Sequence, residues 1–131
     1  MTTYSYYQEL KRPKWAPPAW LFGPVWTVLY VLIAASFGNV FWAAWQGAVS
    51  GLVALPFVLN LIFNLSFTWL QFGLRNNTLA AIDVLLVFLT LVWAMVAVYP
   101  YIPWVAYVNI PYLLWVGFAT VLQLTVTYLN R

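Results

Sequence analysis

The chain has 131 residues, of which 66% are hydrophobic, 21% aromatic and only 5% charged. A soluble domain carries roughly a quarter charged residues, so most of this surface must face lipid and a soluble globular class is excluded. Histidine and cysteine are both absent, which excludes disulfides, thiolate nucleophiles, zinc sites and the usual axial haem ligands.

Residues 1–19 are polar, aromatic and rich in proline, with Pro13, Pro17 and Pro18 close together. Prolines at this density prevent a regular helix, so we expect a loop that lies at the membrane interface. The apolar run at 20–45 has no charged residue and is too long for the apolar part of a cleavable signal peptide. It is therefore expected to be the first membrane span.

Three further apolar runs follow, at residues 52–74, 79–98 and 104–129, with short polar or proline-containing turns between them. Each run has about 20 residues or more, enough to cross a hydrocarbon core of about 30 Å as a helix. Thr78 or Asn77 is expected to cap the third helix. The sequence therefore predicts an all-α transmembrane helical bundle with four spans, forming a single membrane domain over 1–131.

The basic residues indicate how this bundle is oriented. Lys11, Arg12 and Lys14 precede the first span, Arg75 joins the second and third, and Arg131 ends the chain, so all five lie on one side of a four-span bundle. The positive-inside rule then places both termini in the cytoplasm, most simply of a bacterial inner membrane. The net charge of +3 is accounted for by this orientation and does not indicate nucleic-acid binding.

Nine tryptophans are a large excess for this length. Most lie near predicted span ends, where tryptophan favours the headgroup level of the bilayer. Trp115 does not, because it lies near the middle of the last span, and Trp26 lies about two turns into the first. A buried indole N–H needs a partner, so Trp115 is expected either to pack in the core or to contact a ligand.

Polar side chains recur along one face of the second span. Asn60, Asn64, Phe67 and Gln71 are spaced by four, three and four residues, which puts three amides and a ring on one helix face. Amides in lipid turn toward another helix or a cavity, so each alone is read as a helix-to-helix hydrogen bond, and the stripe as the lining of a pocket. Asp83, the acid within a span, is open to a structural or a functional reading.

The last span carries a matching face with Asn109, Tyr112, Trp115 and Ala119. Pro111 lies within it and frees the carbonyl of Tyr107, which predicts a local kink. We expect the faces of the second and fourth spans to meet.

Several motifs in order resemble the tryptophan-rich sensory protein and translocator protein family (TspO/MBR). They are the PKWAPP run at 13–18, FGPVWTVLY at 22–30, NLIFN at 60–64, AAID at 80–83 and PYLLWVGFAT at 111–120. The resemblance implies binding of tetrapyrroles such as protoporphyrin IX, with no required cofactor, in a pocket that the Pro-rich loop closes. In bacterial members, tryptophans that match Trp26 and Trp115 are tied to porphyrin photochemistry.

The resemblance, together with the polar residues described above, predicts which residues line the ligand site. Candidate ligand-binding residues are Tyr7, Leu10, Trp26, Tyr30, Asn60, Asn64, Phe67, Tyr112, Trp115 and Ala119, with Gln71 and Asp83 as polar support and no metal ligand. Because histidine is absent, a metal-free porphyrin or bilin is favoured over haem.

Family members have five helices, and this sequence begins where their first loop begins. The resemblance therefore implies that the family's first helix is not included, either because the protein is short or because the sequence is a truncation. We expect a homodimer, or a partner helix, to cover the corresponding flank, with Gly38 at the contact.

Three functions stay open at this point. The first is a membrane receptor that binds a porphyrin-like molecule for sensing, transport or disposal. The second is a structural subunit of a larger membrane complex. The third is an enzyme that degrades porphyrin in light, with Trp26 and Trp115 as redox-active side chains.

Overall fold

The computed structural model describes Lys14 and residues 19–74 and 76–130; the side chains of Ala19, Thr68, Gln71 and Phe72 lie outside the described part. The first long helix, α2, covers Ala19–Trp45. It ends in a Schellman motif: the Gly47 N–H donates to the Ala44 carbonyl and the Ala48 N–H to the Ala43 carbonyl. Gly47 has a φ of 78°, which a residue without a Cβ adopts at little cost.

Two further helices form an antiparallel pair. Helix α3 covers Gly51–Thr68 and continues as a short π-helix, η1, at Trp69–Gly73. Helix α4 covers Asn77–Val98 and is capped by Asn76, whose side chain accepts a hydrogen bond of 2.9 Å from the Leu79 N–H. The expected cap at Asn77 or Thr78 is therefore wrong, by one or two positions, because Asn76 is the last extended residue before the helix.

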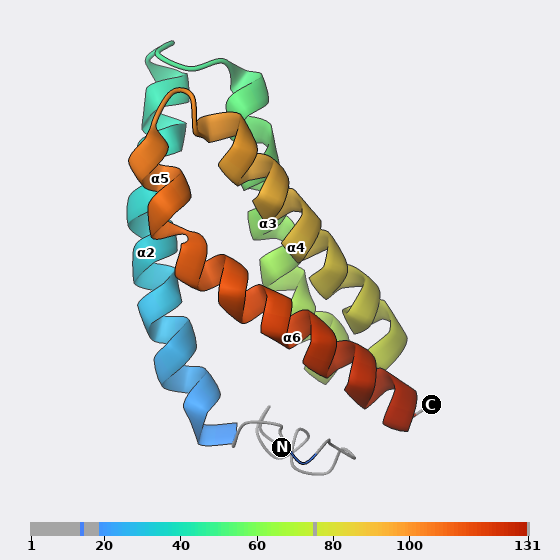
Figure 1. Ribbon diagram of the computed structural model, residues 1–131. Helices are drawn as coiled ribbons and strands as arrows, with labels where there is room; N and C mark the ends of the chain where they lie inside the picture. Colours follow the sequence, from blue (N-terminus) through green and yellow to red (C-terminus); the bar gives the residue numbers. More distant parts are fainter. Residues whose placement is uncertain (1–13, 15–18, 75, 131) are drawn as a thin grey trace.

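Helix α4 packs along both α3 and α6, and Figure 1 shows it on the side of the bundle away from α2. It contributes buried residues along its whole length, including Ala80, Leu91 and Val98. Helix α2 stands at the edge and packs against α3 and α5. Its anchor in the core is Phe37, whose ring meets that of Phe57 edge-on at 4.8 Å.

The last predicted span is two helices instead of one. Helix α5 covers Pro103–Val108 and α6 covers Ile110–Leu129, with Asn109 between them. Pro111 has no N–H to donate to the Tyr107 carbonyl, and that carbonyl accepts from the Asn109 N–H instead. The kink expected at Pro111 is therefore a complete interruption of the helix.

The side chain of Asn109 repairs part of this interruption. Its Nδ2 donates to the Val105 carbonyl at 2.8 Å, the acceptor that the Asn109 N–H would use in an unbroken helix. The same Nδ2 donates to Ser36 Oγ of α2 at 3.0 Å. Asn109 is completely buried, and its Oδ1 has no hydrogen-bond partner among the described residues. The joint between α5 and α6 is thus tied directly to α2.

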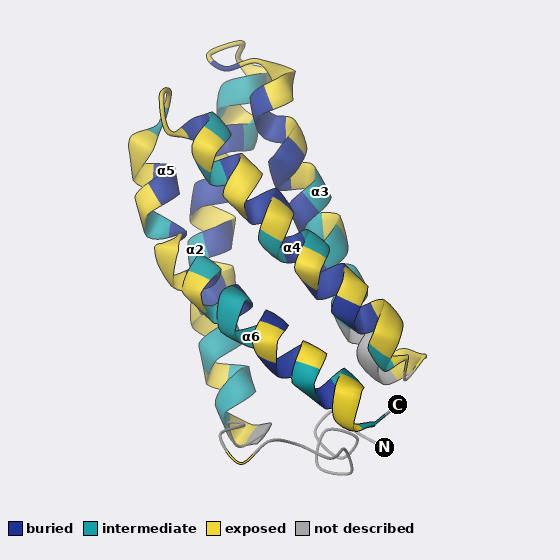
Figure 2. Cartoon of the chain, turned by 45° about the vertical axis from the view of Figure 1, so that its right-hand side comes forward, coloured by how far each residue is buried: buried dark blue, intermediate teal, exposed yellow. Residues whose placement is uncertain are grey.

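Lengths and surfaces of the helices suit a lipid solvent. Trp20–Trp45, Asn77–Val98 and Ile110–Leu129 are each long and apolar enough to cross a membrane, while the apolar helix Gly51–Phe67 is shorter and reaches Gly73 only with η1. The outward faces are exposed and apolar, whereas the buried positions form inward stripes (Figure 2). The predicted all-α membrane fold is confirmed.

Candidate functional site

The two asparagines of α3 point into the bundle, as their spacing predicts. Asn60 has no exposed surface, and Asn64 is 5% exposed. A buried amide must find hydrogen-bond partners. These two amides find partners on each of the other three long helices, α2, α4 and α6. The result is a hydrogen-bond chain from Tyr30 to Thr90, which we call the relay.

The outer half of the relay joins α2, α3 and α6. The Tyr30 hydroxyl donates to Asn64 Oδ1 at 2.9 Å. Asn64 Nδ2 donates in turn to the Tyr112 hydroxyl at 2.8 Å. Tyr112 is completely buried, whereas Tyr30 is 42% exposed, so the relay begins at the surface of the bundle and runs inward.

The inner half of the relay continues to α4. The Tyr112 hydroxyl donates to Asn60 Oδ1 at 2.8 Å. Asn60 Nδ2 donates to the Val87 carbonyl at 2.9 Å and to Thr90 Oγ1 at 3.2 Å. Both ends of the Asn60 amide are thus used within the protein, so a ligand would reach Asn60 only if the relay opened.

An aromatic group surrounds Tyr112. Trp26 stands edge-on to the Tyr112 ring, with centroids 6.3 Å apart, and lies tilted against Tyr30 at 5.4 Å. Phe37, which lies on α2 like Trp26, also contacts Tyr112, with ring centroids 6.5 Å apart. Rings at these separations attract one another beyond the burial of their area. Three of the predicted ligand-binding residues, Trp26, Tyr30 and Tyr112, therefore lie together.

A second aromatic group lies nearer the start of α2. Trp115 stands edge-on to Phe22 of α2 at 5.8 Å and tilted against Phe118 of its own helix at 5.7 Å. Its Nε1 is buried and has no hydrogen-bond acceptor among the described residues. An indole N–H in this position normally has a partner, so the described structure leaves one buried donor open here.

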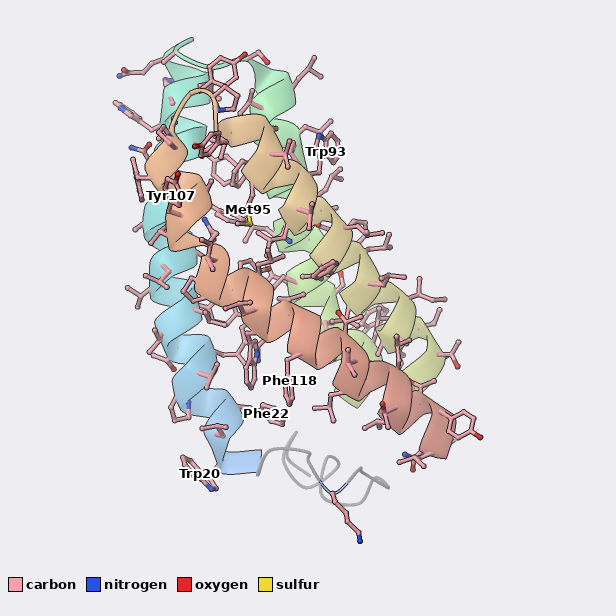
Figure 3. All side chains as sticks on the ribbon, in the orientation of Figure 1. Trp20, Phe22, Trp93, Met95, Tyr107 and Phe118 are labelled. Carbon is pink, nitrogen blue, oxygen red and sulfur yellow. The ribbon has the colours of Figure 1, made fainter. Side chains whose placement is uncertain are left out.

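The two aromatic groups lie where α2 and α6 separate. The two helices diverge from the α5–α6 joint toward the end of the bundle where α2 begins and α6 ends, as Figures 1 and 2 both show. Figure 3 shows Phe22 and Phe118 in the space between the diverging helices. Aromatic side chains from both helices therefore point into the separation between them.

The other predicted site residues fall into two sets. Phe67 and Ala119 are half-buried and pack against the core, and Asp83 is buried in α4 with its Oδ2 lacking a hydrogen-bond partner in the described part of the chain. Tyr7, Leu10 and the side chain of Gln71 lie outside the described residues. Direct contact with a ligand stays a prediction for every member of the site.

Four residues that contact the site or the α5–α6 joint were not singled out from the sequence. They are Phe22 and Phe118 beside Trp115, Thr90 at the inner end of the relay, and Ser36 beside Asn109. An inward position for Thr90 could have been predicted, because Thr90 lies seven residues after Asp83 and shares its helix face. Ser36 was a hydroxyl within an apolar span, a residue type that bonds between helices in membranes.

Comparison with known proteins shows that the chain is similar to a single family of membrane proteins. Residues 1–129 match the TspO/MBR family. The Tryptophan-rich protein TspO of Chlorobaculum tepidum is 31% identical over 92 residues, which cover 70% of this chain and 58% of that protein. The Uncharacterized membrane protein YtaB of Bacillus subtilis is 33% identical over 126 residues, covering 95% and 80%. The human Translocator protein is 32% identical over 113 residues, covering 74% and 64%. The match thus spans less than two thirds of the Chlorobaculum and human proteins.

Proposed function

Because the chain belongs to the TspO/MBR family, we propose that this integral membrane protein binds a tetrapyrrole of the protoporphyrin IX type between α2, α3 and α6. Sensing, transport or disposal of that molecule would be its role. The observation that carries the proposal is the buried Trp115 N–H, which has no acceptor among the described residues and lies within an aromatic group.

The chemistry of the site suits a flat, largely apolar ligand. Rings from Phe22, Trp26 and Trp115 offer edges and faces to a macrocycle, and burial of apolar area contributes about 25 cal/mol per Å². Trp115 offers a single N–H donor, which suits a carbonyl or carboxylate oxygen at the ligand's edge. The basic residues that precede α2 in the sequence would attract the propionate groups of such a ligand.

Titration of the purified protein in lipid nanodiscs with protoporphyrin IX, followed by quenching of tryptophan fluorescence, tests the proposal. We expect saturable binding, and we expect Trp115→Phe to weaken it by about 0.5–1.5 kcal/mol, because an aromatic ring is kept at the position and one hydrogen bond is lost. Trp45→Phe is the matched control, since Trp45 is 85% exposed at the far end of α2. Absence of saturable binding by the unaltered protein would overturn the proposal.

A homodimer is the proposed assembly. Gly38 and its neighbours Ala34 and Ala35 are exposed on α2, and a Cβ added at Gly38 meets nothing within 4 Å. Small residues on a membrane helix permit close approach of a second helix. Gly38→Leu is accommodated within one chain, so it should reduce crosslinking between chains in bilayers without unfolding the protein. Crosslinking that is unchanged would exclude this face as the contact.

A further inference from the structure

The inner end of the relay lies too deep for direct contact with a ligand. Asn60 is completely buried and Thr90 is 8% exposed. Asn60 of α3 links the Tyr112 hydroxyl to Thr90 of α4, whereas Trp26 of α2 contacts the Tyr112 ring. Their effect on anything bound between α2 and α6 would therefore pass through Tyr112.

Helix α4 fixes the direction of every hydrogen bond in the relay. The Thr90 hydroxyl donates to the Leu86 carbonyl at 2.7 Å, so toward Asn60 it can only accept. The Val87 carbonyl likewise only accepts. These two acceptors hold the Asn60 amide with its nitrogen toward α4 and its oxygen toward Tyr112.

The fixed Asn60 amide then dictates the rest of the chain. Because Asn60 presents an oxygen, the Tyr112 hydroxyl must donate to it, and the Tyr112 oxygen is left to accept from Asn64. Asn64 in turn presents its oxygen to the Tyr30 hydroxyl. Hydrogen bonds aligned in this way polarise and strengthen one another in a low-dielectric interior.

We infer that Asn60 and Thr90 are positioning residues of the proposed ligand site, an inference that rests on the proposed function. They hold the Tyr112 hydroxyl, and the Tyr112 ring in turn holds Trp26 edge-on at 6.3 Å. This gives Asn60 a different role from the direct contact expected from the sequence. It also brings α4, which carries none of the aromatic rings of the site, into control of ligand affinity.

Spectroscopy of the ligand-free protein tests the inference without any ligand. Selective ¹⁵N labelling of the indole groups, assigned with Trp26→Phe and Trp104→Phe, follows Trp26 and Trp104 separately. Asn60→Leu and Thr90→Val should move the Trp26 signal and leave the Trp104 signal in place, whereas Thr90→Ser should restore it. Ser66→Ala is the matched control, because the Ser66 hydroxyl bonds to the Ile62 carbonyl of its own helix.

Titration with protoporphyrin IX supplies the second readout. We expect Asn60→Leu to weaken binding up to about tenfold, the equivalent of one well-formed hydrogen bond, and Thr90→Val to weaken it less. Thr90→Ser and Ser66→Ala should bind like the unaltered protein. If Asn60→Leu fails to fold, the milder Thr90→Val decides.

The possible outcomes separate the two proposals. A Trp26 signal that neither Asn60→Leu nor Thr90→Val moves would overturn the positioning role, whatever the affinity. Failure of the unaltered protein to bind protoporphyrin IX would overturn the proposed function, while the Trp26 signal would still decide whether Asn60 and Thr90 position the aromatic rings. A shifted Trp26 signal with unchanged affinity would also overturn the role in binding.

Discussion

Tyr112 is the residue on which the interior of the bundle converges. Its hydroxyl accepts from Asn64 and donates to Asn60, and its ring contacts Trp26 and Phe37. Hydrogen bonds between membrane helices contribute about 0.6 kcal/mol each, with a maximum near 1.7. The contribution of Tyr112 is larger than that of a single bond, because its loss leaves two buried amides unsatisfied.

The stability of the bundle should therefore depend on where the relay is cut. Tyr112→Phe removes two buried hydrogen bonds and should lower the thermal unfolding midpoint in detergent more than Tyr30→Phe, which removes one bond at a half-exposed side chain. Tyr101→Phe, at an exposed position, is the control. Equal midpoints for the Tyr112 and Tyr30 variants would contradict the relay.

The residues of the site differ in how far the sequence predicts them. The four-residue spacing of Asn60 and Asn64 correctly predicts two inward amides, because both positions share a helix face. Their partners depend on how α3 is aligned along α4 and α6, which spacing within one helix does not contain. Val87 and Thr90, some 30 residues further along the chain, could therefore not be assigned to Asn60 in advance.

At the scale of the elements, the break between α5 and α6 is the main departure from regular helices. Asn109 replaces one lost backbone hydrogen bond with its side chain and ties the break to Ser36 of α2. Unpaired backbone groups are costly inside a membrane, so the break is sustained by this one side chain.

Removal of the Asn109 amide should accordingly destabilise the joint. Asn109→Leu keeps a similar volume and loses the bonds to Val105 and Ser36, so we expect a loss of about 1 kcal/mol in the free energy of unfolding. Asn39→Leu is the matched control, because Asn39 is an exposed amide on α2. Unfolding measured by denaturant in detergent should separate the two variants, and equal stabilities would show that the joint does not need Asn109.

The apolar runs predict where the helices lie better than they predict whether a helix is continuous. The run at 20–45 becomes α2 almost residue for residue, because a long uncharged segment in lipid has to satisfy its backbone internally. The run at 104–129 is also apolar. Its break depends on Pro111 together with a neighbouring side chain, Asn109, that takes over one of the lost backbone bonds. Proline alone predicts a kink and leaves its size open.

For the whole molecule, the placement of positive charge predicts the orientation in the membrane. The segment before α2, the connection between α3 and α4, and the end of the chain hold all five basic residues. We expect reporter fusions within Gln46–Ser50 and after Arg131 to report opposite sides of the membrane, with Arg131 in the cytoplasm. Reporters on the same side would contradict the odd number of spans, three, between these two points, and the charge-based orientation with it.

The arrangement of the bundle divides the tryptophans into two kinds. Six are exposed on the described helices: Trp20, Trp42, Trp45, Trp69, Trp93 and Trp104. Trp26 and Trp115 are half-buried and pack against the core beside the separation of α2 and α6. Replacement of the buried pair and of an exposed pair therefore tests the location of the site independently of the total tryptophan content.

The most direct measurement compares protoporphyrin IX affinity in two double variants, monitored by the absorbance of the porphyrin so that tryptophan loss does not affect the signal. We expect Trp26→Leu with Trp115→Leu to weaken binding by at least about 1 kcal/mol, because two aromatic contacts of about 0.5–1.5 kcal/mol each are removed. The exposed pair, Trp42→Leu with Trp93→Leu, should bind like the unaltered protein. Unchanged affinity in the Trp26 and Trp115 double variant would contradict a ligand site between α2, α3 and α6.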